Sequence, residues 1–190
     1  EPYLGLVHRL DQPVSGVLVF AKNKKTAADL SNQVTNGTMK KFYYALIYGT
    51  PIRERDTLED YLYKDGRENL SLIVNATFPD AKKAILNYRH CSTLMVLEEG
   101  EEVSLMEIEL LTGRHHQIRA QMSNAGMPLL GDRKYGSDRS KELSRDIGCK
   151  NVALCAYKLS FKHPVTHKEM VFEKQPEEEL FDPFLNEGIL

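Results

Sequence analysis

The sequence lacks the features that mark membrane, secreted and metal-binding proteins. None of its apolar runs approaches the roughly 18 residues that a membrane helix requires. Its first residues, EPYLGLVHRLD, contain no basic segment followed by a long apolar one, as a signal peptide would. The three cysteines have no CxxC spacing, which is typical of reduced thiols in an intracellular protein. We therefore expect a cytoplasmic protein with no membrane association and no metal site.

The chain also lacks a starting methionine, internal repeats and low-complexity segments. Its 190 residues suit one domain of ordinary size, and no composition shift marks a boundary within residues 1–190. Because a strand-like segment already begins at Tyr3, we expect residues upstream of this chain to be missing. Hydrophobic residues make up 42% of the chain and charged residues 27%, which is typical of a globular domain. No pattern indicates an oligomer, so we expect a monomer.

A strong excess of one charge sign is missing from the chain as a whole, whose formal net charge is −2. Residues 111–150, however, contain eight basic and four acidic side chains, which is a local excess of positive charge. Such an asymmetry permits a basic face for nucleic acid on an otherwise acidic protein. Ordinary scatter of solvated charges explains the same counts equally well, so charge alone does not identify the partner.

Alternating and helical patterns predict an α+β domain. Strands are predicted over residues 17–21, 41–49, 84–90, 94–98, 103–111, 152–161 and 170–172, with a hairpin over residues 53–74 that turns near residues 65–66. One helix is predicted over residues 23–35, ended by Gly37, and another within TGRHHQIRAQMSNAG, where Thr112 is a candidate N-cap. Because most strands are joined as sequence neighbours, we expect a mixed, mainly antiparallel β-sheet with flanking helices.

The stretch HRLDQPVSG places a carboxylate, Asp11, in a turn that Pro13 and Gly16 predict, directly before the apolar run of residues 17–21. A carboxylate held at the end of a buried strand can face a cleft, where it would be ionised at neutral pH and could act as a nucleophile or base. An aspartate that only caps its own turn is the competing interpretation, and residue type and position alone favour it.

Two further clusters carry candidate functional groups. In KKFYYAL, Tyr43 and Tyr44 face opposite sides of a strand, so one is expected in the core while the other could stack on a planar ring. In TGRHHQIR, Arg114 follows a glycine at the mouth of a helix, where a cation and free amides suit an anion. The adjacent His115 and His116 point in different directions and make a poor metal pair. Purely structural roles remain open for both clusters.

Four motifs together resemble those of the RluA-type pseudouridine synthases. In chain order they are HRLDQPVSGVLVFAK, KKFYYAL, LLTGRHHQIRAQMSNAGMPLLGDRKYG and LCAYKLSFKHP, and the resemblance extends from Leu6 to Pro176. It implies the pseudouridine synthase catalytic fold and an isomerase that converts specific uridines in structured RNA to pseudouridine, with no metal and no cofactor. The implied partner is RNA, either ribosomal RNA, with the large subunit favoured, or tRNA.

The resemblance also implies roles for individual residues. Asp11 matches the catalytic aspartate of the HRLD motif, Tyr43 the active-site tyrosine, and Arg114 an arginine that pairs with the catalytic aspartate. The target base must leave its stack, and Arg9 matches an arginine that fills the vacated place. The residues expected to bind RNA are Arg9, His8, Arg119, His116, Gln117, Arg133 and Lys134. Whether the aspartate attacks C1′, attacks C6 or promotes loss of a sugar proton stays open.

Three residues depart from the family's pattern. Val14 stands where a hydroxyl is usual, and Gln121 and Cys155 each stand where a histidine is common. Together with the short N-terminus they motivate an alternative hypothesis, a catalytically weak or inactive relative that binds RNA or acts as an RNA chaperone with the same fold. An unrelated hydrolase that uses a carboxylate is a third hypothesis.

Overall fold

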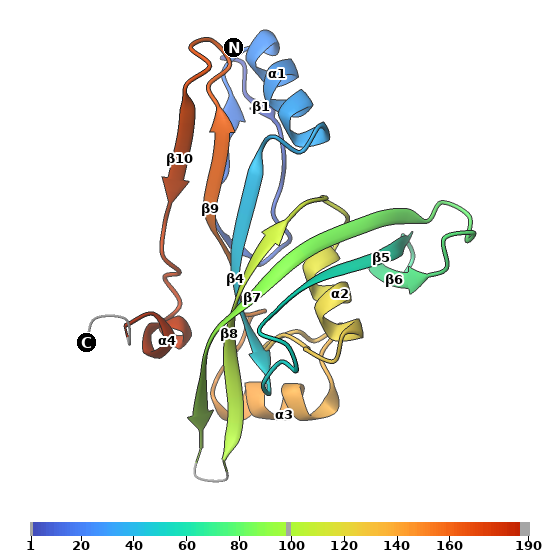
Figure 1. Cartoon of the computed structure of the whole chain (residues 1–190), viewed down its shortest axis with the longest axis vertical. Coiled ribbons are helices and arrows are strands. Elements are labelled where there is room, and N and C mark those ends of the chain that lie inside the picture. The colour runs from blue at the N-terminus through green and yellow to red at the C-terminus, as the bar shows by residue number, and fades with distance from the viewer. Residues whose placement is uncertain (1, 98–99, 187–190) are drawn as a thin grey trace.

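A computed structural model of the chain, which describes residues 2–97 and 100–186, contains one large twisted sheet with helices on both faces and at one end (Figure 1). The strands are β1 (Gly5–Leu6), β2 (Ser15–Gly16), β3 (Phe20–Ala21), β4 (Lys40–Tyr48), β5 (Arg55–Asp65), β6 (Leu70–Val74), β7 (Lys82–Val96), β8 (Glu101–Leu110), β9 (Leu154–Lys162) and β10 (Glu169–Glu173). The large sheet has the order β10-β9-β4-β8-β7-β5-β6, and β2 adds to β9. Its pairs are antiparallel except β2–β9, which confirms the predicted α+β class and mixed, mainly antiparallel sheet.

The helices in the described part of the chain are α1 (Lys24–Thr35), α2 (Gln117–Asn124), α3 (Asp138–Asp146) and α4 (Asp182–Asn186), with a 3₁₀ turn over Glu179–Phe181 before the last. In Figure 1, α1 lies at one end of the molecule beside β1, and α2 lies against the sheet near β5 and β7. Side chains of α2 enter the core on one face of the sheet, whereas those of α3 and α4 enter the core on the other.

The central strand β4 supplies side chains to both faces of the sheet in alternation. Tyr43, Ala45 and Ile47 belong to the core beneath α2, while Tyr44 and Leu46 contact the core beneath α3 and α4. Burying a large apolar side chain contributes about 1.5–3 kcal/mol, so two buried rows hold β4 in place. This arrangement confirms that Tyr43 and Tyr44 face opposite sides, and it fixes Tyr43 on the α2 face.

The strand predicted over residues 17–21 is wrong over most of its length. Only its last two residues, in β3, form a strand, and Leu18 is exposed. The backbone N–H of Val17 donates to the Ala156 carbonyl in β9, whereas β3 pairs with β1 in a separate two-stranded sheet. The chain therefore changes its hydrogen-bonding partner in the middle of the apolar run, and the run cannot be one buried strand.

The other predicted strands are confirmed with ends that differ by at most two residues, with one merger. Residues 84–90 and 94–96 belong to the single strand β7, whose pairing with β8 is irregular between His90 and Ser92, and residue 97 lies in the turn that follows. The remaining predicted residue of that segment, residue 98, lies outside the described residues. The β5–β6 hairpin turns after Asp65 as predicted.

The helix predictions are right for α1 and partly wrong for α2. The Asn23 side chain caps α1 by accepting from the Thr26 N–H at 2.8 Å, and Gly37 follows the helix with φ +75°. Thr112 is not the cap of α2, because its hydroxyl donates to the Gln117 side chain at 2.8 Å and accepts from the Ile85 N–H at 2.9 Å. The helix α3 lies in a segment that the sequence pattern identifies only as polar.

Candidate active site

Asp11 lies in the loop between β1 and β2, which is anchored directly on the central sheet. The Val14 N–H donates to the Asp11 carbonyl at 2.7 Å and closes a turn, as predicted. Gly16 is not part of that turn: it lies in β2 with φ +132°, and a Cβ there would come within 2.3 Å of the Ala156 carbonyl oxygen. A glycine is therefore required for β2 to approach β9, and this contact positions the Asp11 loop.

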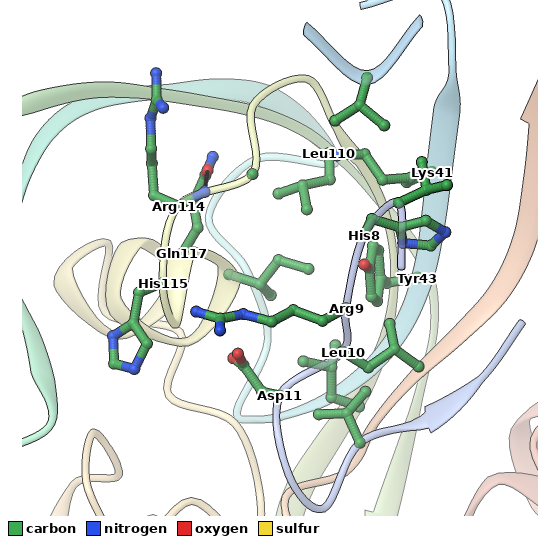
Figure 2. Close-up of a pocket in the computed structure, with 16 residues that line it drawn as sticks. His8, Arg9, Leu10, Asp11, Lys41, Tyr43, Leu110, Arg114, His115 and Gln117 are labelled. Atoms are coloured by element: carbon green, nitrogen blue, oxygen red, sulfur yellow. Dashed lines mark hydrogen bonds between the residues drawn. The ribbon is translucent and has the colours of Figure 1, made fainter. Parts of the chain in front are cut away.

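Asp11 and Tyr43 line one cavity of about 240 Å³ (Figure 2). Its wall also includes Arg9, Lys41 and Arg114. Tyr43 is only 6% exposed, so its ring forms part of the cavity floor as well as part of the core. The structure thus brings together the carboxylate and the tyrosine that the sequence predicts as catalytic.

Asp11 is a half-buried carboxylate beside two arginines. Burial raises the pKa of Asp11, the positive charges of Arg119 and Arg9 lower it, and the negative charge of Asp132 raises it. Figure 2 shows the Arg9 side chain extending toward the Asp11 carboxylate. Burial is the largest of these effects, so the pKa of Asp11 lies above its usual value, and the two cations limit that rise.

Arg114 does not pair with Asp11 in this structure. Its side chain is exposed, its Nε donates to the Lys83 carbonyl at 2.9 Å, and Figure 2 shows its guanidinium directed away from Asp11. Because α2 begins only at Gln117, Arg114 lies in the loop before the helix, while Arg119 lies in its first turn. The guanidinium that acts on Asp11 from α2 is that of Arg119, which corrects the pairing expected for Arg114.

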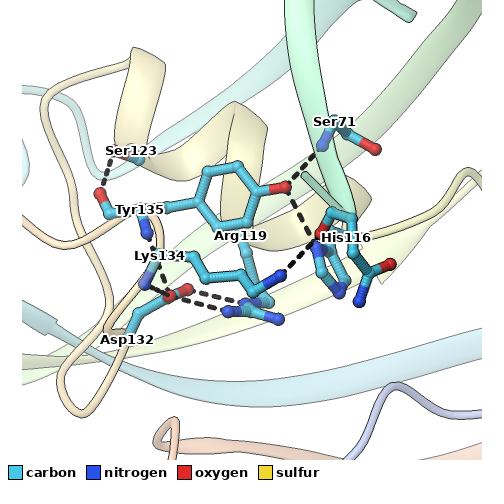
Figure 3. A network of polar contacts seen from close by, with 8 residues as sticks. Ser71, His116, Arg119, Ser123, Asp132, Lys134 and Tyr135 are labelled. Atoms are coloured by element: carbon cyan, nitrogen blue, oxygen red, sulfur yellow. Dashed lines mark hydrogen bonds and ion pairs between the residues drawn. The ribbon is translucent and has the colours of Figure 1, made fainter. Parts of the chain in front are cut away.

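A polar network behind the pocket holds Arg119 in place (Figure 3). Arg119 donates to both carboxylate oxygens of Asp132 at 2.7 Å, and the Asp132 side chain is 0% exposed. The Asp132 carboxylate also accepts from the backbone N–H groups of Lys134 and Tyr135, and the guanidinium lies 5.1 Å from the centre of the Tyr135 ring. We call Arg119, Asp132, Tyr135 and His116 the α2 network.

Three residues expected to bind RNA are instead buried in protein contacts. Arg119 is 6% exposed, His116 7% and Gln117 2%. His116 stacks on His115 and shares a hydrogen bond of 3.0 Å with the Tyr135 hydroxyl, and burial together with the Arg119 charge lowers the pKa of His116 to about 3. Gln117 accepts from the Arg114 N–H and donates to the Ile85 carbonyl. Gln117 nevertheless lines the cavity that contains Asp11, and His116 and Arg119 line the neighbouring groove, so their role in RNA binding stays a prediction.

The other residues expected to bind RNA lie at or near the surface. Arg9, Arg133 and Lys134 are exposed, and His8 is half-buried. Arg133 and Lys134 line a groove of about 290 Å³ that also includes Lys150 and the Gln12–Pro13 part of the Asp11 loop. Basic side chains therefore line a groove that adjoins the Asp11 loop.

The three departures from the family's pattern all fit the structure. Val14 is half-buried and contacts the core beneath α2. Gln121 is 0% exposed, and its amide donates to the Asp60 carboxylate at 2.8 Å and so ties α2 to β5. Cys155 is 2% exposed and lies opposite Ser15 in the β2–β9 pair.

Sequence reasoning did not identify Lys41 as part of the cavity that contains Asp11, nor Asp132 as the partner of Arg119. Asp132 stands in a loop between two glycines, and the sequence suggests only that those glycines serve backbone geometry. Its buried partner, Arg119, lies 13 residues earlier in the chain. Lys41 begins a strand as lysines often do, and only the structure shows that it is 8% exposed.

Within residues 2–97 and 100–186, no three His, Cys, Asp or Glu side chains are arranged to hold a metal ion. In the same part of the chain, no helix combines the length and the apolar character needed to cross a membrane.

Known proteins resemble this chain in sequence. The family described as RNA pseudouridylate synthase matches residues 1–124. A Bacillus subtilis protein described as the uncharacterized RNA pseudouridine synthase YlyB is 35% identical over 169 residues, which cover 89% of this chain and 51% of that protein. An Aquifex aeolicus protein described as an uncharacterized RNA pseudouridine synthase is 34% identical over 177 residues, or 91% of this chain and 54% of that protein. The chain spans about half the length of these curated relatives.

A solved structure resembles this chain in fold. The human protein described as RNA pseudouridylate synthase domain containing 1 superposes with a TM-score of 0.75. The match covers 92% of this chain and 69% of the human chain at 24% sequence identity. At that identity the likeness establishes the shared fold.

Proposed function

This chain belongs to the RNA pseudouridylate synthase family, and we propose that it is an isomerase that converts specific uridines in structured RNA to pseudouridine. The observation that carries the proposal is the shared cavity, in which the Asp11 carboxylate and the Tyr43 ring line about 240 Å³ of space beside exposed arginines. A cavity of this kind suits a single base that has left its stack.

The proposed reaction moves the uracil from a nitrogen to a carbon attachment. The N1–C1′ bond breaks and leaves its electron pair on the base, and the C5–C1′ bond then forms after the base has turned. C5 gives up its proton and N1 takes one up, so substrate and product are isomers. No oxidant, reductant or cofactor enters this balance.

We propose Asp11 as the catalytic carboxylate, acting on C1′, on C6 or on a sugar proton. Each of these routes needs the ionised form. Burial raises the pKa of Asp11, and the charges of Arg119 and Arg9 counteract that effect. In this proposal Arg119, held by Asp132, takes the role that the resemblance implied for Arg114.

Tyr43 contributes a neutral phenol and a ring surface. Burial and the negative charge of Asp11 raise the pKa of Tyr43, so the phenol keeps its proton at neutral pH. A protonated phenol cannot take the C5 proton as a phenolate would. We therefore favour stacking of Tyr43 on the base over a role as general base.

The exposed basic residues are proposed to hold the RNA. Arg9 lies at the mouth of the cavity and can fill the place of the flipped base by stacking. Arg133 and Lys134 line the adjacent groove, where they can contact phosphates. The substrates we propose are large-subunit ribosomal RNA or tRNA, bound by a monomer in the cytoplasm.

A comparison of RNA from cells with and without the gene tests the proposal. Total RNA is treated with a carbodiimide that marks pseudouridine, and reverse-transcription stops are mapped. We expect one or a few stops to disappear in the cells without the gene and to return when the gene is restored. If every stop remains, the proposed isomerase activity is refuted, and the alternative of an inactive RNA-binding relative gains support.

A further inference from the structure

Two neighbouring lysines at the start of β4 have opposite environments. The Lys40 side chain is 59% exposed and forms an ion pair with Glu109 at 3.9 Å. Lys41, by contrast, is 8% exposed and lines the same cavity as Asp11 and Tyr43. The alternation of the strand therefore directs one ammonium group to solvent and the next toward the candidate active site.

The ammonium of Lys41 has no protein partner within the part of the chain that the structure describes. Among residues 2–97 and 100–186, no carboxylate lies within ion-pair distance of its Nζ and no acceptor forms a hydrogen bond with it. The Nζ lies at the loop after β8, because a Cβ at Gly113 would be 3.4 Å from it. The apolar side chains of Val34 and Leu110 line the same cavity. Burial of most of the side chain lowers the pKa of Lys41, so an acceptor that a ligand brings into the cavity would stabilise the ammonium.

His8 lines the same cavity as Lys41 and carries a second polar atom without a hydrogen-bond partner among the described residues. Its Nε2 accepts from the Val19 N–H at 3.4 Å, which places the ring proton on Nδ1, and the buried Nδ1 has no hydrogen-bond partner. Burial and the Lys41 charge lower the pKa of His8 to about 4, so the ring is neutral at physiological pH. Figure 2 shows the two side chains near Tyr43, and we call Lys41 and His8 the inner wall.

Resting on the proposed function, we propose that Lys41 is a further catalytic residue, whose ammonium donates a hydrogen bond to a carbonyl oxygen of the flipped uracil. When the N1–C1′ bond breaks, its electron pair stays on the base and the negative charge spreads over N1 and the two carbonyl oxygens. The fixed cation stabilises this charge in a site with little water, where such an interaction is stronger than in solution. The charge disappears once C5 has bonded to C1′, C5 has lost its proton and N1 has gained one.

A phosphate of the RNA is the other source of oxygen that Lys41 could bind. The position of the ammonium favours the base, because Lys41 lies beside Tyr43 within the cavity, whereas the basic residues of the neighbouring groove are exposed. A phosphate drawn to the inner wall would lose the strong hydration of an ionised group, whereas the carbonyl groups of a flipped uracil are neutral and cost less to desolvate.

The test compares Lys41→Met with the matched control Lys40→Met in single-turnover reactions at saturating enzyme. The substrate is a transcript that carries the uridine identified by the carbodiimide map, made once with uridine and once with 5-fluorouridine. Fluorine makes the departing uracil anion less basic, so this anion needs less stabilisation of its negative charge. Pseudouridine formation, or loss of intact 5-fluorouridine, is measured by mass spectrometry of nuclease digests, and RNA affinity is measured by fluorescence anisotropy.

We expect Lys41→Met to lower the saturated rate on uridine RNA by about 100-fold or more, with affinity changed by less than about threefold. The loss on 5-fluorouridine RNA should be smaller by about tenfold. Lys41→Arg should recover part of the rate, while Lys41→Gln, which keeps a donor without the charge, should not. Lys40→Met should stay within about twofold of the wild type.

Other outcomes overturn the inference in distinguishable ways. An unchanged rate with weaker binding would assign Lys41 to a phosphate, and equal losses on both RNAs would exclude a role in charge stabilisation on the base. If Lys41→Met fails to fold, the contrast between Lys41→Arg and Lys41→Gln on the two RNAs decides the same question. A wild-type protein with no turnover on either RNA refutes the proposed function itself.

Discussion

The α2 network and the inner wall differ in whether their buried polar groups have hydrogen-bond partners. In the network, Arg119 donates two hydrogen bonds to the Asp132 carboxylate. The backbone N–H groups of Lys134 and Tyr135 donate to the same carboxylate. In the inner wall, neither the Lys41 ammonium nor the His8 Nδ1 has a partner among the described residues. A satisfied cluster fixes geometry before RNA arrives, whereas an unsatisfied one indicates where a polar ligand belongs.

The two arginines near Asp11, Arg119 and Arg9, differ in the same respect. In the proposed mechanism Arg119 is a positioning residue whose own direction is set by Asp132, so its effect depends on the fold of α2 and the loop that follows. Arg9 reaches Asp11 from the exposed loop and has no such support. We therefore expect substitutions in the network to affect stability and activity together, and substitutions at the pocket mouth to affect RNA binding most.

The Asp11 carboxylate gives the largest expected effect on activity. Asp11→Asn keeps the shape of the side chain and removes its charge, so turnover should fall by roughly 10³-fold or more while RNA affinity remains. Pseudouridine formation in single-turnover reactions and fluorescence anisotropy measure the two quantities. Asp146→Asn, which changes an exposed carboxylate on α3, is the control. Retained turnover in Asp11→Asn would remove Asp11 from the mechanism.

The α2 network predicts the largest effect on stability. Arg119→Met leaves the 0% exposed Asp132 carboxylate without its partner, and breaking a buried pair in this way costs about 3–5 kcal/mol of unfolding free energy. Urea denaturation measures the loss. The control Arg139→Met removes an arginine whose ion pairs are exposed, and it should cost no more than about 1 kcal/mol. Equal losses in the two variants would contradict the distinction between buried and exposed pairs.

The sequence was sufficient to predict the elements with strong local signals. The alternation in KKFYYAL predicted β4 and the opposite directions of Tyr43 and Tyr44, and helical spacing with a following glycine predicted the limits of α1. It missed α3 because that helix, DRSKELSRD, buries only Ser140, Leu143 and Ser144 and is otherwise polar. Its signals were the cap at Ser137 and the contact of Leu143 with the core, and the latter depends on the tertiary fold.

The candidate site was predictable in its membership but not in its pairing. Arg114 and Arg119 stand in one motif, and spacing alone does not say which one reaches Asp11. The answer depends on where α2 begins, which is set by the left-handed conformation of His116 and by the contacts of Gln117. The direction of a side chain in a loop before a helix has no periodic signal in sequence, unlike that of a side chain within a strand.

Arg114→Ala sharpens the contrast between the two arginines and should have a moderate effect. An exposed cation that contacts phosphate contributes chiefly to affinity, so the saturated rate should fall by less than about tenfold and RNA binding should become less sensitive to salt. Titrations at several salt concentrations and single-turnover rates measure both effects. A loss of saturated rate as large as that of Asp11→Asn would mean that Arg114 moves to pair with Asp11 when RNA binds.

Val14→Thr tests the smallest effect, at the residue where the family's pattern has a hydroxyl. Because Val14 is half-buried against the core beneath α2, an added hydroxyl without a partner should cost about 1 kcal/mol of unfolding free energy and leave the rate within about threefold. Val34→Thr, at a half-buried valine that lines the same cavity, is the matched control. A rate that rises tenfold or more in Val14→Thr alone would show that the missing hydroxyl limits turnover, and would favour the hypothesis of a catalytically weakened relative.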